Sequence, residues 1–157
     1  MPERSITHGS FTIERVYAAS PARVFAAFAD PTVKQQWFRG PDDWDDSGLD
    51  LDFRVGGREH NSGGPKGEWV SPYDAIYHDI VPNERIVSTY DMRVDGKLIS
   101  VSLATVELSP EGTGTHLTFT EHGAYLDDFD NVAGRKEGTE QLLAALERVL
   151  DRATANA

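Results

Sequence analysis

The stretch GRKEGTEQLLAALERVLDRA, Gly134 to Ala153, decides the fold of this chain. Its apolar residues recur at the i, i+3, i+4, i+7 spacing of a helix with one buried face, and they are Leu142, Leu143, Leu146, Val149, Leu150 and Ala153. Such a helix needs an apolar partner. Almost all of the chain between Glu68 and His122 has the pattern of extended strand. We therefore predict one antiparallel sheet that curls around the long last helix.

Length, composition and charge limit the class of protein. The chain has 157 residues, no cysteine, and 26 acidic against 15 basic residues, for a formal net charge of -11. We expect a single domain over residues 1–157, with its core at 11–152, that needs no disulfide or metal. The charge repels phosphate backbones and anionic lipids, which argues against nucleic acid and membrane partners. No signal-peptide or membrane-span window is present, so we expect a cytoplasmic protein.

The first third of the chain predicts one strand and two short helices. Ser10–Tyr17 is rich in β-branched and aromatic residues and predicts a strand. Ser20 and Asp30 each precede a proline, which is the signal of an N-cap followed by the first helical residue. They predict helices over Pro21–Ala29 and from Pro31 to about Trp37.

The middle of the chain predicts loops that alternate with strands. Gly40–Gly48 is an acidic loop by composition, and Leu49–Val55 alternates apolar and charged residues as a half-buried strand does. Gly56–Gly67 contains five glycines and predicts a hairpin loop with partial strand on its near side, and Gly123–Asn131 predicts a loop before the last helix. The remaining predicted strands are Glu68–Ile80, Arg85–Arg93, Leu98–Leu108 and Thr115–His122. The order is β-α-α, five strands and one long helix, an α+β arrangement.

Several stretches carry a resemblance to a known superfamily: VFAAF at 24–28 with Asp30-Pro31 and Trp37-Phe38, YHDIVPNERI at 77–86, GTHLTFT at 114–120, and Arg135 with Gly138-Thr139 and the leucines of the last helix. The chain resembles the START-like (SRPBCC, Bet v 1-like) superfamily. Within it, the chain resembles the group related to the carboxy-terminal domain of the Hsp90 ATPase activator and to bacterial enediyne self-resistance proteins. The resemblance implies a helix-grip fold. In that fold a curved antiparallel sheet of six to seven strands wraps the long helix, two short helices follow the first strand, and a cavity lies between sheet and helix.

Strand alternation places small and polar side chains on the face of the sheet that looks toward the helix. Together with aromatic residues they predict a ligand pocket with apolar walls and a few polar groups. The candidate ligand-binding residues are Trp37, Phe38, Trp69, Ser88, Tyr90, Met92, Ser100, Ser102, Phe119, Leu142 and Leu146. The alternative is that these residues pack a solid core. The opposite face of strand 98–108 is also apolar, which leaves open a homodimer surface or a register shifted by one residue.

Glu121 is the candidate catalytic residue. On the same face as Phe119, its carboxylate would lie in a partly apolar cavity, where burial raises a carboxyl pKa. It could then act as general acid or base in an aldol-type cyclisation, or bind a ligand hydroxyl. The alternative is a solvated carboxylate at the strand end, paired with a nearby arginine.

No metal or cofactor is expected. The five histidines are scattered, with no H-x-H or H-E-x-x-H spacing. Asp43, Asp45 and Ser47 mimic the first half of an EF-hand loop, but Arg54 stands where a bidentate glutamate is needed. We interpret the acidic stretch as a solvated loop at the cavity mouth. No Walker A, nucleophile-elbow or dinucleotide fingerprint is present.

Three functions remain, and we favour the first. The chain binds an apolar, ring-containing small molecule; or it is an enzyme of the polyketide cyclase or aromatase kind; or, by resemblance alone, it regulates a chaperone. The chain departs from the eukaryotic activator because that protein's separate amino-terminal domain has no counterpart in these 157 residues. Hsp90 is therefore not an expected partner.

Overall fold

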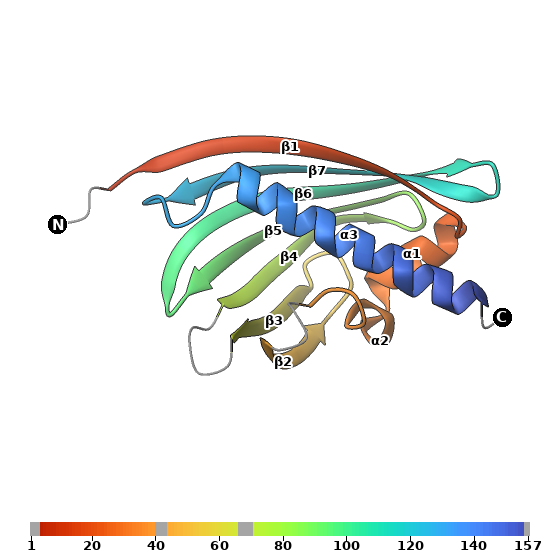
Figure 1. The fold of residues 1–157 in the computed structure, drawn as a ribbon, viewed down its shortest axis with the longest axis horizontal. Coiled ribbons are helices and arrows are strands. Elements are labelled where there is room, and N and C mark those ends of the chain that lie inside the picture. The colour runs from red at the N-terminus through yellow and green to blue at the C-terminus, as the bar shows by residue number, and fades with distance from the viewer. Residues whose placement is uncertain (1–3, 40–43, 66–70, 156–157) are drawn as a thin grey trace.

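A computed structural model describes residues 4–39, 44–65 and 71–155. Seven strands form one antiparallel sheet in the order β1-β7-β6-β5-β4-β3-β2. The strands are β1 (Ile6–Tyr17), β2 (Trp44–Leu51), β3 (Arg58–Pro65), β4 (Ser71–Val81), β5 (Arg85–Val94), β6 (Lys97–Glu111) and β7 (Gly114–Leu126). The helices are α1 (Pro21–Ala29), α2 (Pro31–Lys34) and α3 (Val132–Ala155). The sheet curves around α3, which crosses it diagonally, so the α+β helix-grip prediction is confirmed (Figure 1).

The helices begin where the sequence signals placed them. Ser20 caps α1 by accepting a hydrogen bond from the Arg23 amide, and Asp30 caps α2 by accepting one from the Thr32 amide. The second helix is shorter than predicted, because the chain continues from Lys34 as turns rather than as α-helix. The last helix is longer at both ends than the predicted Gly134–Ala153.

Two predictions around β2 were wrong. The predicted acidic loop Gly40–Gly48 contains the first half of β2, which begins at Trp44; residues 40–43 lie outside the described ranges. The predicted strand Leu49–Val55 ends at Leu51, because the chain then turns back toward β3. Gly57 sits at this turn, where a Cβ atom would lie 2.1 Å from a backbone oxygen of the same turn. The pairing of β2 with β3 therefore sets the bounds of these strands. The alternation of apolar and charged residues over 49–55 did not predict them.

Two predicted loops contain strand residues. Most of Gly56–Gly67 forms β3, which pairs with β2 on one side and β4 on the other. The first residues of Gly123–Asn131 extend β7 to Leu126, which pairs with Ile6 of β1. In both cases neighbouring strands on two sides satisfy the backbone, and this outweighs the low strand propensity of glycine.

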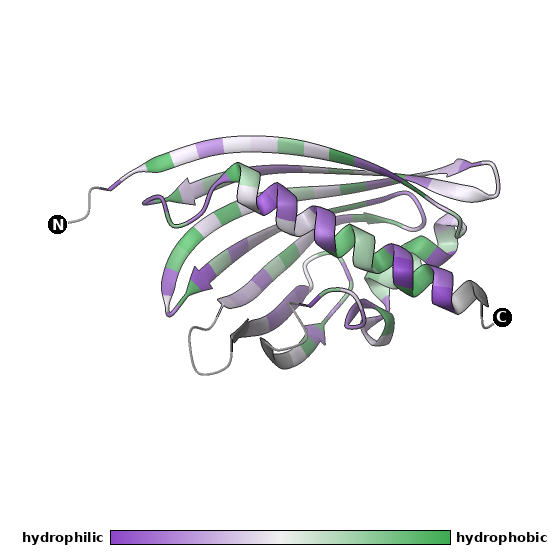
Figure 2. Cartoon of the chain, viewed as in Figure 1, coloured by the Kyte–Doolittle hydropathy of each residue, from purple (hydrophilic) through white to green (hydrophobic). Residues whose placement is uncertain are grey.

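The register of β6 settles which of its faces looks inward. Ser100, Ser102 and Ala104 are buried on the concave face. Val101 and Leu103 remain 45% and 40% exposed on the convex face, as expected from the predicted parity. Figure 2 shows hydrophobic residues interspersed with hydrophilic ones along β1.

The apolar core fills one part of the concave face, where α1 and the second half of α3 pack on the sheet. Its fully buried members include Tyr17, Val24, Ala27, Leu117, Leu143 and Leu146. Among the helices in the described segments, none combines the length and the apolar character needed to cross a bilayer.

Candidate functional site

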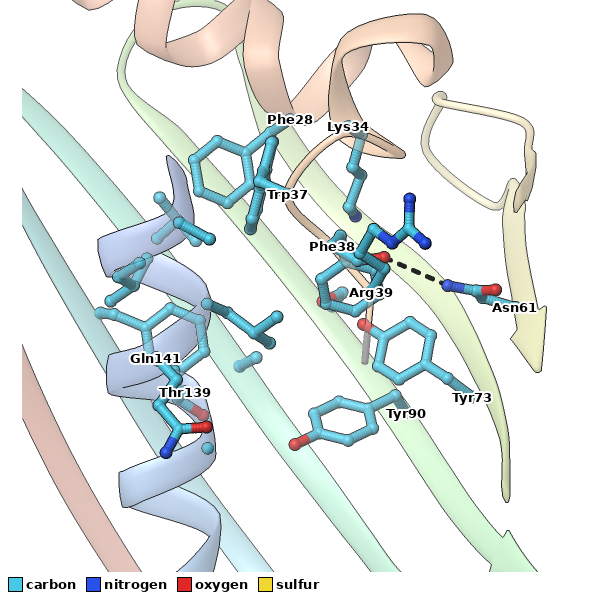
Figure 3. Close-up of a pocket in the computed structure, with 18 of the residues that line it drawn as sticks. Phe28, Lys34, Trp37, Phe38, Arg39, Asn61, Tyr73, Tyr90, Thr139 and Gln141 are labelled. Atoms are coloured by element: carbon cyan, nitrogen blue, oxygen red, sulfur yellow. Dashed lines mark hydrogen bonds between the residues drawn. The ribbon is translucent and has the colours of Figure 1, made fainter. Parts of the chain in front are cut away.

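A cavity of about 800 Å³ occupies the rest of the concave face. Its walls come from β3 to β7, from α1 and α3, from α2 with the segment after it, and from Phe53 after β2. One wall is a row of aromatic rings: Phe38 and Tyr73 lie 4.9 Å apart between centroids, and Tyr73 and Tyr90 lie 4.7 Å apart. These rings point into the space beside α3, with Trp37 at the end of the row (Figure 3). This wall of the site is thus largely apolar and aromatic.

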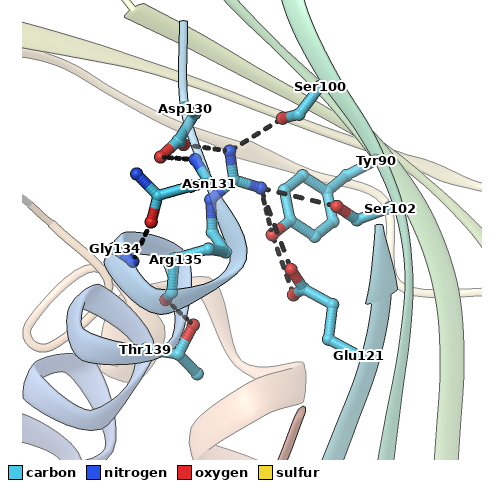
Figure 4. A network of polar contacts seen from close by, with 9 residues as sticks. All are labelled: Tyr90, Ser100, Ser102, Glu121, Asp130, Asn131, Gly134, Arg135 and Thr139. Atoms are coloured by element: carbon cyan, nitrogen blue, oxygen red, sulfur yellow. Dashed lines mark hydrogen bonds and ion pairs between the residues drawn. The ribbon is translucent and has the colours of Figure 1, made fainter. Parts of the chain in front are cut away.

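Arg135, in the first turn of α3, organises a polar network at one end of the cavity. Its guanidinium donates hydrogen bonds to four side chains: Ser100 Oγ at 2.7 Å, Asp130 Oδ2 at 2.7 Å, Tyr90 Oη at 2.9 Å and Ser102 Oγ at 3.4 Å. Tyr90 in turn donates to Glu121 Oε1 at 2.8 Å (Figure 4). The network ties the start of α3 to strands β5, β6 and β7.

Glu121 lies inward and is only 1% exposed, and the Nη1 atom of Arg135 lies 3.8 Å from its Oε2 atom. The carboxylate is therefore buried, as the first interpretation predicts, and the solvated alternative is wrong, although an arginine does lie beside it. Burial raises the pKa of Glu121, and the hydrogen bond from Tyr90 and the charge of Arg135 oppose that shift. The Oε2 atom has no hydrogen-bond partner among the described residues.

A second buried polar cluster joins α2 to β3 and β4. Lys34 Nζ lies 2.5 Å from Glu59 Oε1, and the hydroxyl of Tyr77 donates to the same oxygen. The Lys34 ammonium also lies 4.6 Å from the centre of the Phe38 ring. Burial, and then the charge of Glu59, raises the pKa of Tyr77 well above its ordinary value. Lys34 and Tyr77 form part of the cavity wall, whereas Glu59 lies behind them.

The structure brings most of the sequence-predicted site residues to one cavity. Those on its wall are Trp37, Phe38, Ser88, Tyr90, Met92, Phe119, Glu121 and Leu142. Ser100 and Ser102 lie behind the wall, where they accept hydrogen bonds from Arg135. Leu146 is fully buried in the apolar core, and Trp69 lies outside the described residues.

Sequence reasoning missed several polar and aromatic residues of the site. Arg135 shares the buried stripe of α3 with Thr139 and Leu142, at the i+4 and i+7 positions, so helical periodicity could have found it. Tyr73 follows a proline at the start of β4, and Lys34 is the buried residue of a helix that spans four residues. Glu59 fell inside the predicted glycine-rich loop. Neither of the last two carries a pattern that indicates burial.

The described residues contain no group of three or more His, Asp or Glu side chains that could hold a metal ion. The carboxylates of the site are engaged by Arg135 and Lys34 instead. The arrangement offers apolar contact, aromatic stacking, and one free carboxylate oxygen.

Chains of known structure resemble this one closely. A putative uncharacterized protein from Rhizobium leguminosarum is 41% identical, with 96% of this chain and 99% of that chain covered and a TM-score of 0.90. The Mll3558 protein from Rhizobium loti is 46% identical, with 92% and 99% covered and a TM-score of 0.86. The AHSA1-like protein from Aeromonas hydrophila, at 20% identity over 93% and 94% with a TM-score of 0.71, shares the fold.

No curated protein matches the sequence. The sequence profile of one family matches residues 18–151, which include all three helices except the end of α3 and all strands after β1. The fold, the matched range and the similar structures agree, and the chain belongs to the Activator of Hsp90 ATPase homolog 1-like protein family.

Proposed function

We propose that the protein binds a small, mainly apolar, ring-containing molecule between the sheet and α3. The observation that carries this proposal is the cavity of about 800 Å³ with its row of aromatic rings. Ligand sites of proteins have volumes of roughly 300 to 1,000 Å³, apolar walls, and a few oriented polar groups. The Arg135 network supplies the polar groups at one end of the cavity.

A neutral fluorescent dye, N-phenyl-1-naphthylamine, tests the proposal. Ala145 lies on the part of α3 that faces the cavity, and Ala133 is exposed near the start of the same helix. We expect saturable dye binding by the native protein and a dissociation constant at least about tenfold higher in Ala145→Phe, because the new ring fills the site. Ala133→Phe is the matched control and should bind as the native protein does. Equal binding by both variants, with native circular dichroism, would place the dye elsewhere and contradict the proposal.

Catalysis by Glu121 is the second candidate function. It is favoured by a buried carboxyl group whose pKa is raised by burial and whose Oε2 atom accepts no hydrogen bond from the described residues. A general acid or base of a cyclase would have these properties. We expect Glu121→Gln to abolish turnover of a linear polyketone while dye binding persists. If the native protein does not turn over the polyketone, the catalytic proposal is contradicted and ligand binding remains the proposed function.

A further inference from the structure

The cavity contains one polar atom that the protein leaves without a hydrogen bond. In the described part of the chain, the buried side-chain atoms without a partner are Glu59 Oε2, Glu121 Oε2 and Tyr125 Oη. Of these three residues, Glu121 is the one that lines the cavity. A buried polar atom without a partner costs about 1–3 kcal/mol, so native structures rarely retain one without a reason. The partner of Glu121 Oε2 is therefore expected among the contents of the cavity.

Among the described residues, no donor makes a hydrogen bond to Glu121 Oε2. Arg135 Nη1 lies 3.8 Å from Glu121 Oε2, beyond hydrogen-bond length, and donates instead to Tyr90 at 2.9 Å. Its Nη2 atom donates to Ser100 and Asp130, both at 2.7 Å. The single hydroxyl proton of Tyr90 goes to Oε1 of Glu121. Arg135 and Tyr90 therefore give Glu121 Oε2 no hydrogen bond, and this oxygen is left for a ligand.

The charges around Oε2 select the chemical group that fits. A carboxylate or phosphate on the ligand would meet the charge of ionised Glu121, and an ammonium would meet Arg135 close by. A hydroxyl avoids both repulsions. It is also the group that serves either protonation state of Glu121, because it donates to a carboxylate and accepts from a carboxylic acid. A ketone or an ether can only accept.

We infer that the ligand is a neutral phenol or ring-containing alcohol whose hydroxyl hydrogen-bonds to Glu121 Oε2 while its rings lie along Tyr90 and Tyr73. The centroids of these two tyrosine rings are 4.7 Å apart. Tyr90 lies beside Glu121, and Tyr73 lies next to Phe38. This inference rests on the proposed binding function and adds the class of ligand to it.

The test compares 2-naphthol with 2-methoxynaphthalene as competitors of N-phenyl-1-naphthylamine. The two share one ring system, and the ether is the more apolar molecule, so a purely apolar site would prefer it. We expect the native protein to bind the naphthol at least about tenfold more tightly, as a hydrogen bond to a charged group allows. In Glu121→Gln, Tyr90 donates to the amide oxygen and the amide nitrogen faces the cavity. That group donates to both competitors, so their ratio should fall to near one.

Phe119→Leu is the control, because it alters an apolar part of the wall and should shift both competitors by the same factor. A native ratio of one or below, with dye binding intact, overturns the hydroxyl inference and leaves the proposed function standing. A ratio that persists in Glu121→Gln overturns it as well. Absence of dye binding by the native protein contradicts the proposed function itself. If Glu121→Gln does not fold, the native ratio decides alone.

Discussion

Glu121 shows how burial and hydrogen bonding act on one carboxyl group in opposite directions. Removal from water raises its pKa above the ordinary 4.5, and the Tyr90 hydroxyl, the Arg135 charge and Ser102 lower it in part. The net shift is upward. The folded state therefore holds the Glu121 proton more tightly than the unfolded chain does, so the contribution of this group to stability is greatest below pH 4.5.

That shift predicts a pH dependence that Glu121→Gln removes. As the pH rises from about 4.5 through the raised pKa, the native protein loses stability relative to the variant, because glutamine does not titrate. Above the raised pKa the difference levels off. Urea unfolding of both proteins between pH 4 and pH 8 measures it. A difference that is constant across this range would mean that the pKa of Glu121 is the same in the folded and unfolded states.

The sequence predicted the site residues that lie on regular strands and failed for those that tertiary contacts bury. Glu121, Tyr90 and Ser88 follow from the alternation of their strands. Lys34 and Glu59 are buried because each neutralises the other in the folded protein, and neither residue shows this in its local sequence. Pairings of this kind are visible only once the strands and helices have been brought together.

At the scale of elements, the strands that were predicted well differ from those that were not. The β5–β6 hairpin was predicted because alternation and the Asp95-Gly96 turn agree, and both turn residues have positive φ angles of 50° and 82°. The β2–β3 pair was misplaced because β3 carries glycines and polar residues. Its strand conformation comes from hydrogen bonds to β2 and β4, which no window of β3 alone contains.

The contact between β1 and the start of α3 predicts a sensitive glycine. Gly9 pairs with Gly123 across β1 and β7, and a Cβ atom at Gly9 would lie 2.7 Å from Val132 Cβ. Because Val132 Cβ is fixed to the backbone of α3, the helix start would have to shift. We expect Gly9→Ala to lower the free energy of unfolding by about 1–3 kcal/mol, the usual cost of overpacking. Chemical denaturation measures this loss.

Gly138→Ala is the matched control for that substitution. Gly138 lies in the interior of α3, and an added Cβ would meet no atom within 4 Å. Alanine favours the helix over glycine by about 0.5–1 kcal/mol, so this variant should gain stability. A loss in Gly9→Ala no larger than a few tenths of a kcal/mol would show that α3 does not approach β1 as closely as the structure places it.

At the scale of the molecule, α3 borders both the apolar core and the cavity, and Leu142, Leu143 and Ala145 contact both. Three side chains donate to carbonyl oxygens of the helix: Tyr17 to Leu143 at 2.9 Å in the core, Arg23 to Leu150 at 3.1 Å in a half-buried position, and Arg15 to Glu140 at 3.2 Å at the surface. On the cavity side Arg135 attaches the first turn, and much of the remaining length faces the open space. A bound molecule would therefore touch the sheet and α3 together.

This geometry predicts how a ligand changes amide hydrogen exchange. Local unfolding that detaches α3 from the sheet destroys the site. Bound dye should therefore lower the rate of amide exchange that requires this unfolding, by the same factor for each amide concerned. With free N-phenyl-1-naphthylamine at about 100 times its dissociation constant, that factor is about 100, or roughly 2.7 kcal/mol. We expect it for amides of α3 and β5. Amides at the β6–β7 turn, Glu111 to Gly114, lie away from the cavity wall and should exchange unchanged. Protection confined to the turn, or none in α3, would show that the dye does not join α3 to the sheet.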